Sequence, residues 1–248
     1  MEDEAEGGTC AYEPSADFKG NIEVSNKLPS KKILDQCADL LVLDAEGGSR
    51  PFKELYSGPN KAQKQLIIFI RHFFCGHCQE YLRSLSSSIT PDALLSLKIP
   101  TFITVIGCGR PELIRTYQEL TGCTFPIYAD PTRKLYDLLG MTRTWDLGPK
   151  KPEYIQTGIL TASIQSIFQG LRTGSKALSG GDFKQVGGEF LFDGGEVVWC
   201  HRMRNTRDHT EIEELGAMLG VRDARVSIRK RWTSGIKGIG RRSSSWGR

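Results

Sequence analysis

Two cysteines separated by two residues, Cys75 and Cys78, come directly after an apolar run at residues 66–70. A short apolar run predicts a buried strand, and the pattern after it predicts a helix over residues 76–87. A helix N-terminus carries unpaired amide N–H groups and about half a positive charge, which favours a thiolate over a thiol. The pattern therefore predicts a dithiol in which Cys75 attacks and Cys78, one turn further on, closes a disulfide.

The same spacing also occurs in zinc sites and between inert cysteines. Structural zinc needs four ligands, usually from a second matching pair. The remaining cysteines are scattered and form no such pair: Cys10, Cys37, Cys108, Cys123 and Cys200. His77, inside the motif, would stabilise the reduced thiolate as a cation or hydrogen-bond donor. We favour redox use over zinc binding and inert thiols, and expect neither a metal nor an organic cofactor.

The composition is that of a chain without a membrane span or a secretory signal. No run reaches the ~18 apolar residues that a transmembrane helix needs. Residues 1–6 hold four acids, whereas a secretory signal begins with basic residues. Seven cysteines in such a chain indicate mostly reduced thiols rather than a disulfide framework. The sequence predicts a cytoplasmic location, with a nuclear location as the alternative.

The positive charge is concentrated at the C-terminus. Residues 222–248 contain nine Lys or Arg and one acid, in a chain whose net charge is +4. Such a tail is either solvated and disordered or a weak contact for an anionic partner, such as nucleic acid, anionic lipid or an import receptor.

Strand and helix patterns alternate between residues 31 and 220, which we predict to be one domain. Residues 1–30 are expected to be a disordered acidic arm, and residues 221–248 a disordered basic tail. Residues 141–183 interrupt the alternation and predict a helical insertion packed on the sheet, with a moving lid as the alternative. The alternation itself favours a mainly parallel sheet covered on both faces. The expected strands are 41–44, 65–71, 101–107, 125–130, and a hairpin of 187–193 with 196–202; the expected helices are 30–40, 76–87, 110–120, 131–139 and 210–219.

This element order, with a dithiol after the first core strand, resembles the thioredoxin fold. Residues 66–78, ending in Cys-Gly-His-Cys, carry the match most specifically. Residues 125–140 resemble the alkyl hydroperoxide reductase C/thiol-specific antioxidant (AhpC/TSA) superfamily. Residues 181–190, together with Asp208 and His209, resemble its peroxiredoxin-like branch. The resemblance spans roughly residues 33–220 and implies an α/β, thioredoxin-like fold with a central mixed sheet flanked by helices.

The resemblance implies a thiol-dependent antioxidant oxidoreductase that reduces peroxides or disulfides. Cys75 would be the nucleophile, Cys78 the resolving cysteine, and a thioredoxin- or glutathione-type reductant would reopen the disulfide. True peroxiredoxins place Thr or Ser three residues before the nucleophile, where its hydroxyl orients the peroxide, and Pro four residues earlier. This chain has His72 and Ile68 at those positions. A non-catalytic, redox-responsive adaptor of the same fold is the alternative function.

Three further residues are candidates for supporting the dithiol. Arg71 and His72 precede it and either stabilise the thiolate or contact solvent at the strand end. Cys108 follows the second core strand, and the carboxyl ends of neighbouring parallel strands meet over one crevice. It is either a second resolving thiol or a buried, unreactive cysteine. Thioredoxins also place a cis-proline opposite the dithiol, whereas the equivalent stretch here, residues 185–188, contains no proline.

Overall fold

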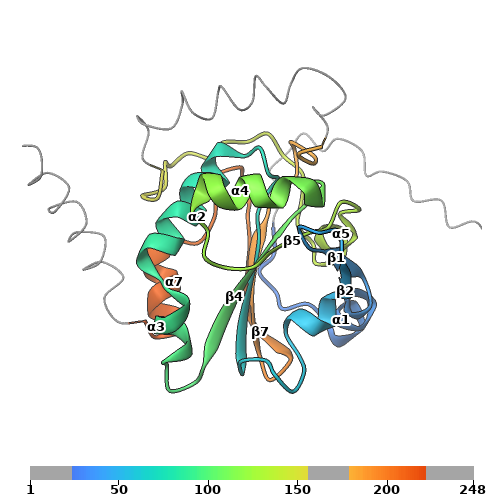
Figure 1. Cartoon of the computed structure of the whole chain (residues 1–248). Coiled ribbons are helices and arrows are strands. Elements are labelled where there is room, and N and C mark those ends of the chain that lie inside the picture. Colours follow the sequence, from blue (N-terminus) through green and yellow to red (C-terminus); the bar gives the residue numbers. More distant parts are fainter. Residues whose placement is uncertain (1–23, 156–178, 222–248) are drawn as a thin grey trace, which may run out of the picture.

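The computed structural model describes residues 24–155 and 179–221. A twisted sheet runs through the molecule, with α2, α4 and α7 on one face and α1 and α5 on the other (Figure 1). The first half of the chain contributes α1 (Lys31–Ala38), β1 (Leu41–Leu43), β2 (Ser49–Pro51), the 3₁₀ turn η1 (Phe52–Leu55), β3 (Lys64–Phe69), α2 (Gly76–Ser88), α3 (Pro91–Leu95) and β4 (Thr101–Gly107). The second half contributes the 3₁₀ turn η2 (Pro111–Leu113), α4 (Ile114–Thr121), β5 (Ile127–Ala129), α5 (Lys134–Leu138), β6 (Gly188–Asp193), β7 (Glu196–Arg202) and α7 (Ile212–Leu219).

The sheet is mixed, with seven strands in the order β2-β1-β5-β4-β3-β6-β7. Only the neighbours β3–β4 and β4–β5 pair in parallel. The remaining neighbours pair antiparallel. The mainly parallel sheet expected from the alternation was therefore wrong, because short strands and a hairpin, which need no crossover helix, extend both edges. The mixed sheet implied by the thioredoxin resemblance is confirmed.

The central strand β3 buries side chains on both of its faces. Leu66 and Ile68 belong to the core under α2, α4 and α7, and Ile67 and Phe69 to the core under α1 and α5. Successive side chains of a strand point to opposite faces, so a strand covered on both sides reads as a continuous apolar run. This is why residues 66–70 could be recognised as a core strand.

Most predicted elements are confirmed, with shifts at their ends. The Asp-Gly hairpin joins β6 to β7 through Gly194 and Gly195, whose φ angles are +59° and +94°. Gly220, at φ +81°, ends α7 in the left-handed conformation that glycine favours. The helix expected from residue 110 begins as the turn η2 and becomes α-helical at Ile114. The short elements β2 and α3 were not predicted, because neither is long enough to show a periodic pattern.

The first described residues lie along the hairpin. The buried guanidinium of Arg202 donates to the carbonyl oxygens of Ser25 and Lys27 at 2.7 and 2.9 Å, and also to that of Leu139. The Arg202 amide donates to Asn26 Oδ1 at 2.9 Å. A buried guanidinium needs acceptors for its donors, and this segment supplies them. Residues 25–27, which precede the boundary predicted at residue 30, are therefore bonded to β7.

Several predictions concern residues that the structure does not describe. The remainder of the acidic arm, the predicted helix of the insertion and the basic tail fall within residues 1–23, 156–178 and 222–248. Among the described helices, none is long and apolar enough to cross a membrane.

A glycine holds the end of β3 close to the start of β6. A Cβ at Gly187 would overlap the carbonyl oxygen of Phe69, which is backbone and cannot turn aside. We expect Gly187→Ala to lower the free energy of unfolding by more than about 2 kcal/mol, because the two segments must separate. Chemical denaturation measures the difference. Gly220→Asn is the matched control: its Cβ meets open space and Asn tolerates a positive φ, so its stability should change by less than about 1 kcal/mol. Equal stabilities for the two variants would contradict this packing.

Candidate active site

The dithiol lies where the chain leaves β3 and enters α2. Cys75 is the N-cap of α2, and its sulfur accepts a hydrogen bond from the Cys78 amide at 3.4 Å. Both cysteines are free thiols, and their exposed fractions are 3% and 0%. The sulfur of Cys75 therefore takes the place that a Ser or Asp oxygen holds at an ordinary helix N-terminus. This position exposes it to the positive end of the helix dipole.

A buried arginine contacts the sulfur of Cys75. Arg71 Nη1 donates to Cys75 Sγ at 3.3 Å. The same guanidinium donates to the carbonyl oxygens of Gln185 at 3.1 Å and Phe183 at 2.5 Å. Two backbone carbonyls thus orient the planar group and leave one donor directed at the thiol. Gln185 belongs to the stretch expected at the place of the thioredoxin cis-proline, and its carbonyl oxygen holds Arg71 beside the dithiol.

The two thiols have opposite acidities. Burial alone would raise the pKa of Cys75, but the hydrogen bond from Cys78 and the positive charge of Arg71 hold it well below its usual range. Burial, followed by the hydrogen bond and negative charge of Cys75, raises the pKa of Cys78 well above its usual range. Cys75 is therefore the thiolate and Cys78 the thiol. This difference is consistent with Cys75 as nucleophile and Cys78 as resolving cysteine, and the two roles stay a prediction.

The two histidines nearest the dithiol carry little positive charge. Burial lowers the pKa of His72 to about 4, and its ring packs edge-on against Phe183 at 4.9 Å. Burial also lowers the pKa of His77. Arg71, rather than His72 or His77, is therefore the permanent cation beside the thiolate.

Cys108 lies next to the site and contacts the backbone of Arg71. Its thiol donates to the Arg71 carbonyl oxygen at 2.9 Å. Burial raises the pKa of Cys108 to about 12, so the sulfur stays protonated at neutral pH. Of the two interpretations of this residue, the geometry favours the buried, unreactive thiol.

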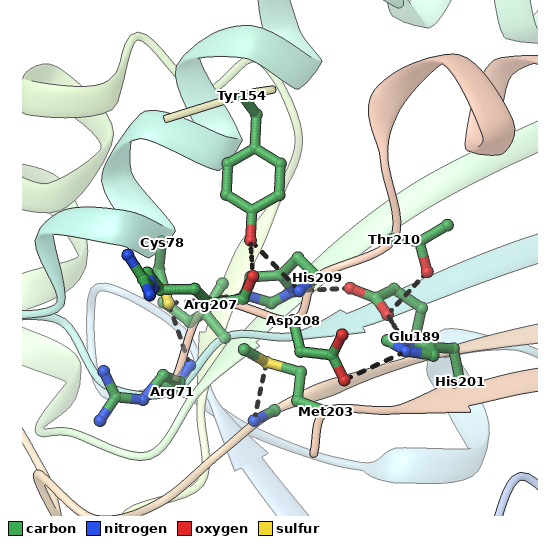
Figure 2. Close-up of polar contacts among 12 residues, drawn as sticks. Arg71, Cys78, Tyr154, Glu189, His201, Met203, Arg207, Asp208, His209 and Thr210 are labelled. Atoms are coloured by element: carbon green, nitrogen blue, oxygen red, sulfur yellow. Dashed lines mark hydrogen bonds and ion pairs between the residues drawn. The ribbon is translucent and has the colours of Figure 1, made fainter. Parts of the chain in front are cut away.

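Cys78 also contacts a network of buried polar groups that sequence reasoning did not assign to the site (Figure 2). Its sulfur lies 3.5 Å from His209 Nε2, and His209 Nδ1 lies 2.6 Å from Glu189 Oε1. The other oxygen of Glu189 lies 2.8 Å from His201 Nδ1 and accepts from the Thr210 hydroxyl at 3.2 Å. Figure 2 shows these side chains in a row from Cys78 to His201.

Glu189 is an ion inside the sheet. Burial alone would raise its pKa, but His209 and His201 hold it at about 2. Burial would lower the pKa of His201, but hydrogen bonds to Asp208 and Glu189 raise it to about 10. Glu189 and His201 are cross-strand partners in β6 and β7, which explains their contact. At neutral pH they form an ion pair.

A signal for this network was present in the sequence. Glu189 stands next to the apolar residues 190–192, in a strand predicted to be buried. An acid is almost never fully buried unless it is paired, so its position called for a basic partner. His201 in the neighbouring strand and His209 after it are two of only four histidines in the chain. His209 was named only as part of a family resemblance.

Both the ring and the backbone of His209 are held by tyrosines. It stacks on Tyr81 of α2, with the ring centroids 4.3 Å apart and an interplanar angle of 8°. The His209 amide donates to the hydroxyl oxygen of Tyr154 at 3.2 Å, and that hydroxyl donates to the Arg207 carbonyl oxygen at 2.7 Å. Within residues 24–155 and 179–221, no group of three His, Cys, Asp or Glu side chains is arranged to hold a metal ion.

Comparison with known proteins identifies the family. A family model described as AhpC/TSA antioxidant enzyme matches residues 85–205, which begin after the dithiol. Peroxiredoxin-like 2C from Takifugu rubripes is 35% identical over 191 residues, covering 76% of this chain and 82% of that protein. Peroxiredoxin-like 2C from Homo sapiens is 32% identical over 194 residues, covering 77% and 82%.

The solved structures that resemble this chain include peroxiredoxins. Reduced Prx3 from Vibrio vulnificus in complex with H₂O₂ gives a TM-score of 0.49 at 12% identity and covers 73% of this chain and 94% of that one. Xanthomonas campestris peroxiredoxin Q gives 0.46 at 13% identity, with 82% and 98% covered. The Peroxiredoxin-like 2C proteins share about a third of their residues with this chain over most of their length. The family and its fold support a thiol-redox function. The chain therefore belongs to the peroxiredoxin-like branch of the AhpC/TSA family.

Proposed function

We propose that this protein is a thiol-dependent antioxidant oxidoreductase that reduces disulfides or peroxides through a Cys75/Cys78 dithiol–disulfide cycle. The contact of Arg71 Nη1 with Cys75 Sγ carries the proposal, because it places a permanent cation on the sulfur that begins α2. A thiolate is the nucleophilic form of cysteine, and a neighbouring cation keeps it populated at neutral pH. The protonated Cys78, three residues further on, is placed to resolve the adduct.

The cycle has four exchange steps when the substrate is a disulfide, two that oxidise the dithiol and two that reduce it. Cys75 thiolate attacks one sulfur, a mixed disulfide forms, and the other sulfur leaves as a thiolate. Cys78 then attacks Cys75 Sγ, the internal disulfide forms, and the second substrate thiol leaves. A dithiol of the thioredoxin type, or two thiols of the glutathione type, then reopens the Cys75–Cys78 bond in two further exchanges and is itself oxidised to a disulfide. With a peroxide, the first step gives a sulfenic acid and water or an alcohol, and resolution releases water.

The site favours a disulfide over a peroxide as substrate. Position 72 carries a buried, neutral imidazole, and no Ser or Thr hydroxyl is available there to orient a peroxide oxygen. A disulfide needs no such hydroxyl, because its sulfur accepts the thiolate along the S–S axis and a thiol of low pKa leaves readily. The redox-responsive adaptor is the competing function, since an adaptor also needs an oxidisable dithiol but does not turn over.

Replacing the cysteines one at a time tests the cycle. Cys75→Ser should reduce turnover to background with a small disulfide, hydrogen peroxide and an organic hydroperoxide, each supplied with a thioredoxin system. Cys78→Ser should stop after the first step, so that mass spectrometry finds the substrate thiol attached to Cys75. Cys123→Ser, another buried thiol, is the control and should retain turnover. Full activity of Cys75→Ser would refute the cycle, and an oxidisable dithiol without turnover would favour the adaptor.

Removing the guanidinium tests why Cys75 is a thiolate. An opposite charge at this distance lowers a pKa by about 1–3 units, so Arg71→Met should slow alkylation of Cys75 by iodoacetamide at pH 6 by about tenfold to a thousandfold. The loss should shrink as the pH rises, because the thiol then begins to ionise without the guanidinium. The rate is followed by mass spectrometry of the peptide that contains Cys75.

Arg115→Met is the matched control for this substitution. Arg115 forms an exposed ion pair with Glu46, and removing that pair should leave the pH profile of Cys75 unchanged. If Arg71→Met also leaves the profile unchanged, the guanidinium is not what keeps Cys75 ionised.

A further inference from the structure

The resolving step requires a thiolate at a sulfur that has no access to water. Cys78 is fully buried, and its sulfur accepts a hydrogen bond from the Arg71 amide at 3.4 Å. Burial, together with Cys75, raises its pKa well above the usual range. A thiol in this state reacts slowly until a neighbouring group removes its proton. The base must therefore come from the protein.

His209 is placed to take this proton. Its Nε2 lies 3.5 Å from Cys78 Sγ, within reach of a hydrogen bond to sulfur. Its Nδ1 lies 2.6 Å from Glu189 Oε1, and an ionised carboxylate can only accept. Nδ1 therefore carries the hydrogen, and in the neutral ring Nε2 is the free acceptor that faces the sulfur.

The carboxylate beside His209 has a second charged partner. The negative charge of Glu189 is matched by His201, whose pKa is about 10, and the two groups are 2.8 Å apart. Asp208 lies 3.7 Å from the other nitrogen of His201. His201, Asp208 and His209 line a cavity of about 1290 Å³, although the side chains of His209 and Glu189 are 0% exposed. The His201 and Asp208 end of the network therefore contacts solvent, with side chains 18% and 31% exposed, whereas the side chains of Glu189 and His209 do not.

We propose that His209 is the general base for Cys78, and that Glu189, held by His201, positions its ring as the third member of a Cys78–His209–Glu189 triad. The inference rests on the proposed dithiol cycle and names the base for the step in which Cys78 attacks Cys75. His209 touches the reacting sulfur and is a catalytic residue. Glu189 and His201 act through His209 and are positioning residues.

The proton and the electrons balance within one turnover. In the mixed disulfide, Cys75 is no longer an anion, so the Cys78 thiol has His209 as its acceptor. The proton moves from Sγ to Nε2, the Cys78 electron pair forms the bond to Cys75 Sγ, and the substrate thiolate leaves with the electron pair of the broken S–S bond. His209 is then an imidazolium beside Glu189. When the dithiol reductant reopens the bond, His209 returns the proton to the departing Cys78.

The other titratable groups around His209 do not gain or lose a proton during this step. Tyr81 of α2 and Tyr154 pack against the ring, and burial raises the pKa of both phenols. Glu189 of β6 stays ionised, because its pKa is about 2. The Cys78–His209 pair is therefore the group whose charge distribution changes during resolution.

A reagent that releases colour in both steps separates them. With 5,5′-dithiobis(2-nitrobenzoate), attack by Cys75 releases one thionitrobenzoate, and attack by Cys78 on the mixed disulfide releases a second. Stopped-flow absorbance resolves the two phases. The full-length protein carries Cys10→Ser, because Cys10 lies outside the described residues and would also react with the reagent. Cys78→Ser in the same background should show the first phase alone.

We expect His209→Gln to slow the second phase by about 100-fold or more at pH 7 and to leave the first phase unchanged, since a general base contributes about 10²–10⁴. The slow phase should then accelerate about tenfold per pH unit, as hydroxide replaces the lost base. Glu189→Gln should slow the second phase less, because its amide oxygen still accepts from Nδ1 but carries no charge. Tyr81→Phe is the control: it keeps the stacked ring and removes only a hydroxyl that has no hydrogen-bond partner among the described residues.

Two results would overturn the assignment, and neither can be confused with failure of the cycle. The first is a folded His209→Gln variant with an unchanged second phase. The second is obtained without any substitution, from nitrogen chemical shifts of ¹⁵N-histidine-labelled, reduced protein. These should show His209 protonated at Nδ1 and bare at Nε2, and the opposite tautomer would exclude the base. A missing first phase would instead contradict the role of Cys75.

Discussion

The guanidinium of Arg71 is the group on which the geometry of this site depends. It bonds to the carbonyl oxygens of Gln185 and Phe183, which belong to the segment that leads into β6, and to the sulfur of Cys75 at the start of α2. The guanidinium that favours the thiolate therefore also links two segments that are more than 100 residues apart in the sequence. A lysine would supply the charge without the planar fork that makes three directed bonds.

A second buried charge, Glu189, organises the other side of the dithiol. An isolated carboxylate in this position would cost several kcal/mol, and the structure offsets that cost with two imidazoles and a hydroxyl. The register places Glu189 opposite His201 on one side and Ile68 on the other, one residue before β3 ends. A shift of one residue would turn its side chain to the opposite face of the sheet, so the network and the strand register specify each other.

The sequence predicted the fold and the dithiol well because both depend on local patterns. The apolar run of β3, the Asp-Gly turn and the helix at Gly76 are each visible within about ten residues. Arg71 and His72 were recognised as neighbours of the dithiol, but which of them carries the charge depends on burial by Phe183 and Gln185, far away in the chain. The contact of His209 with Cys78 joins residues 131 positions apart and has no local signature. Such contacts arise from strand order, which periodicity does not reveal.

The two cysteines share one turn of helix but have different partners, and this difference gives the reaction its direction. Cys75 faces a guanidinium that cannot lose its proton, so its thiolate is stabilised before any substrate arrives. Cys78 faces an imidazole that can gain and lose one, so its thiolate need form only when there is an adduct to resolve. If both sulfurs faced fixed cations, two thiolates would repel each other in the reduced state, and the leaving sulfur would have no acid when the disulfide is reopened. A permanent charge at one sulfur and an exchangeable proton at the other allow the same dithiol to be oxidised and reduced in turn.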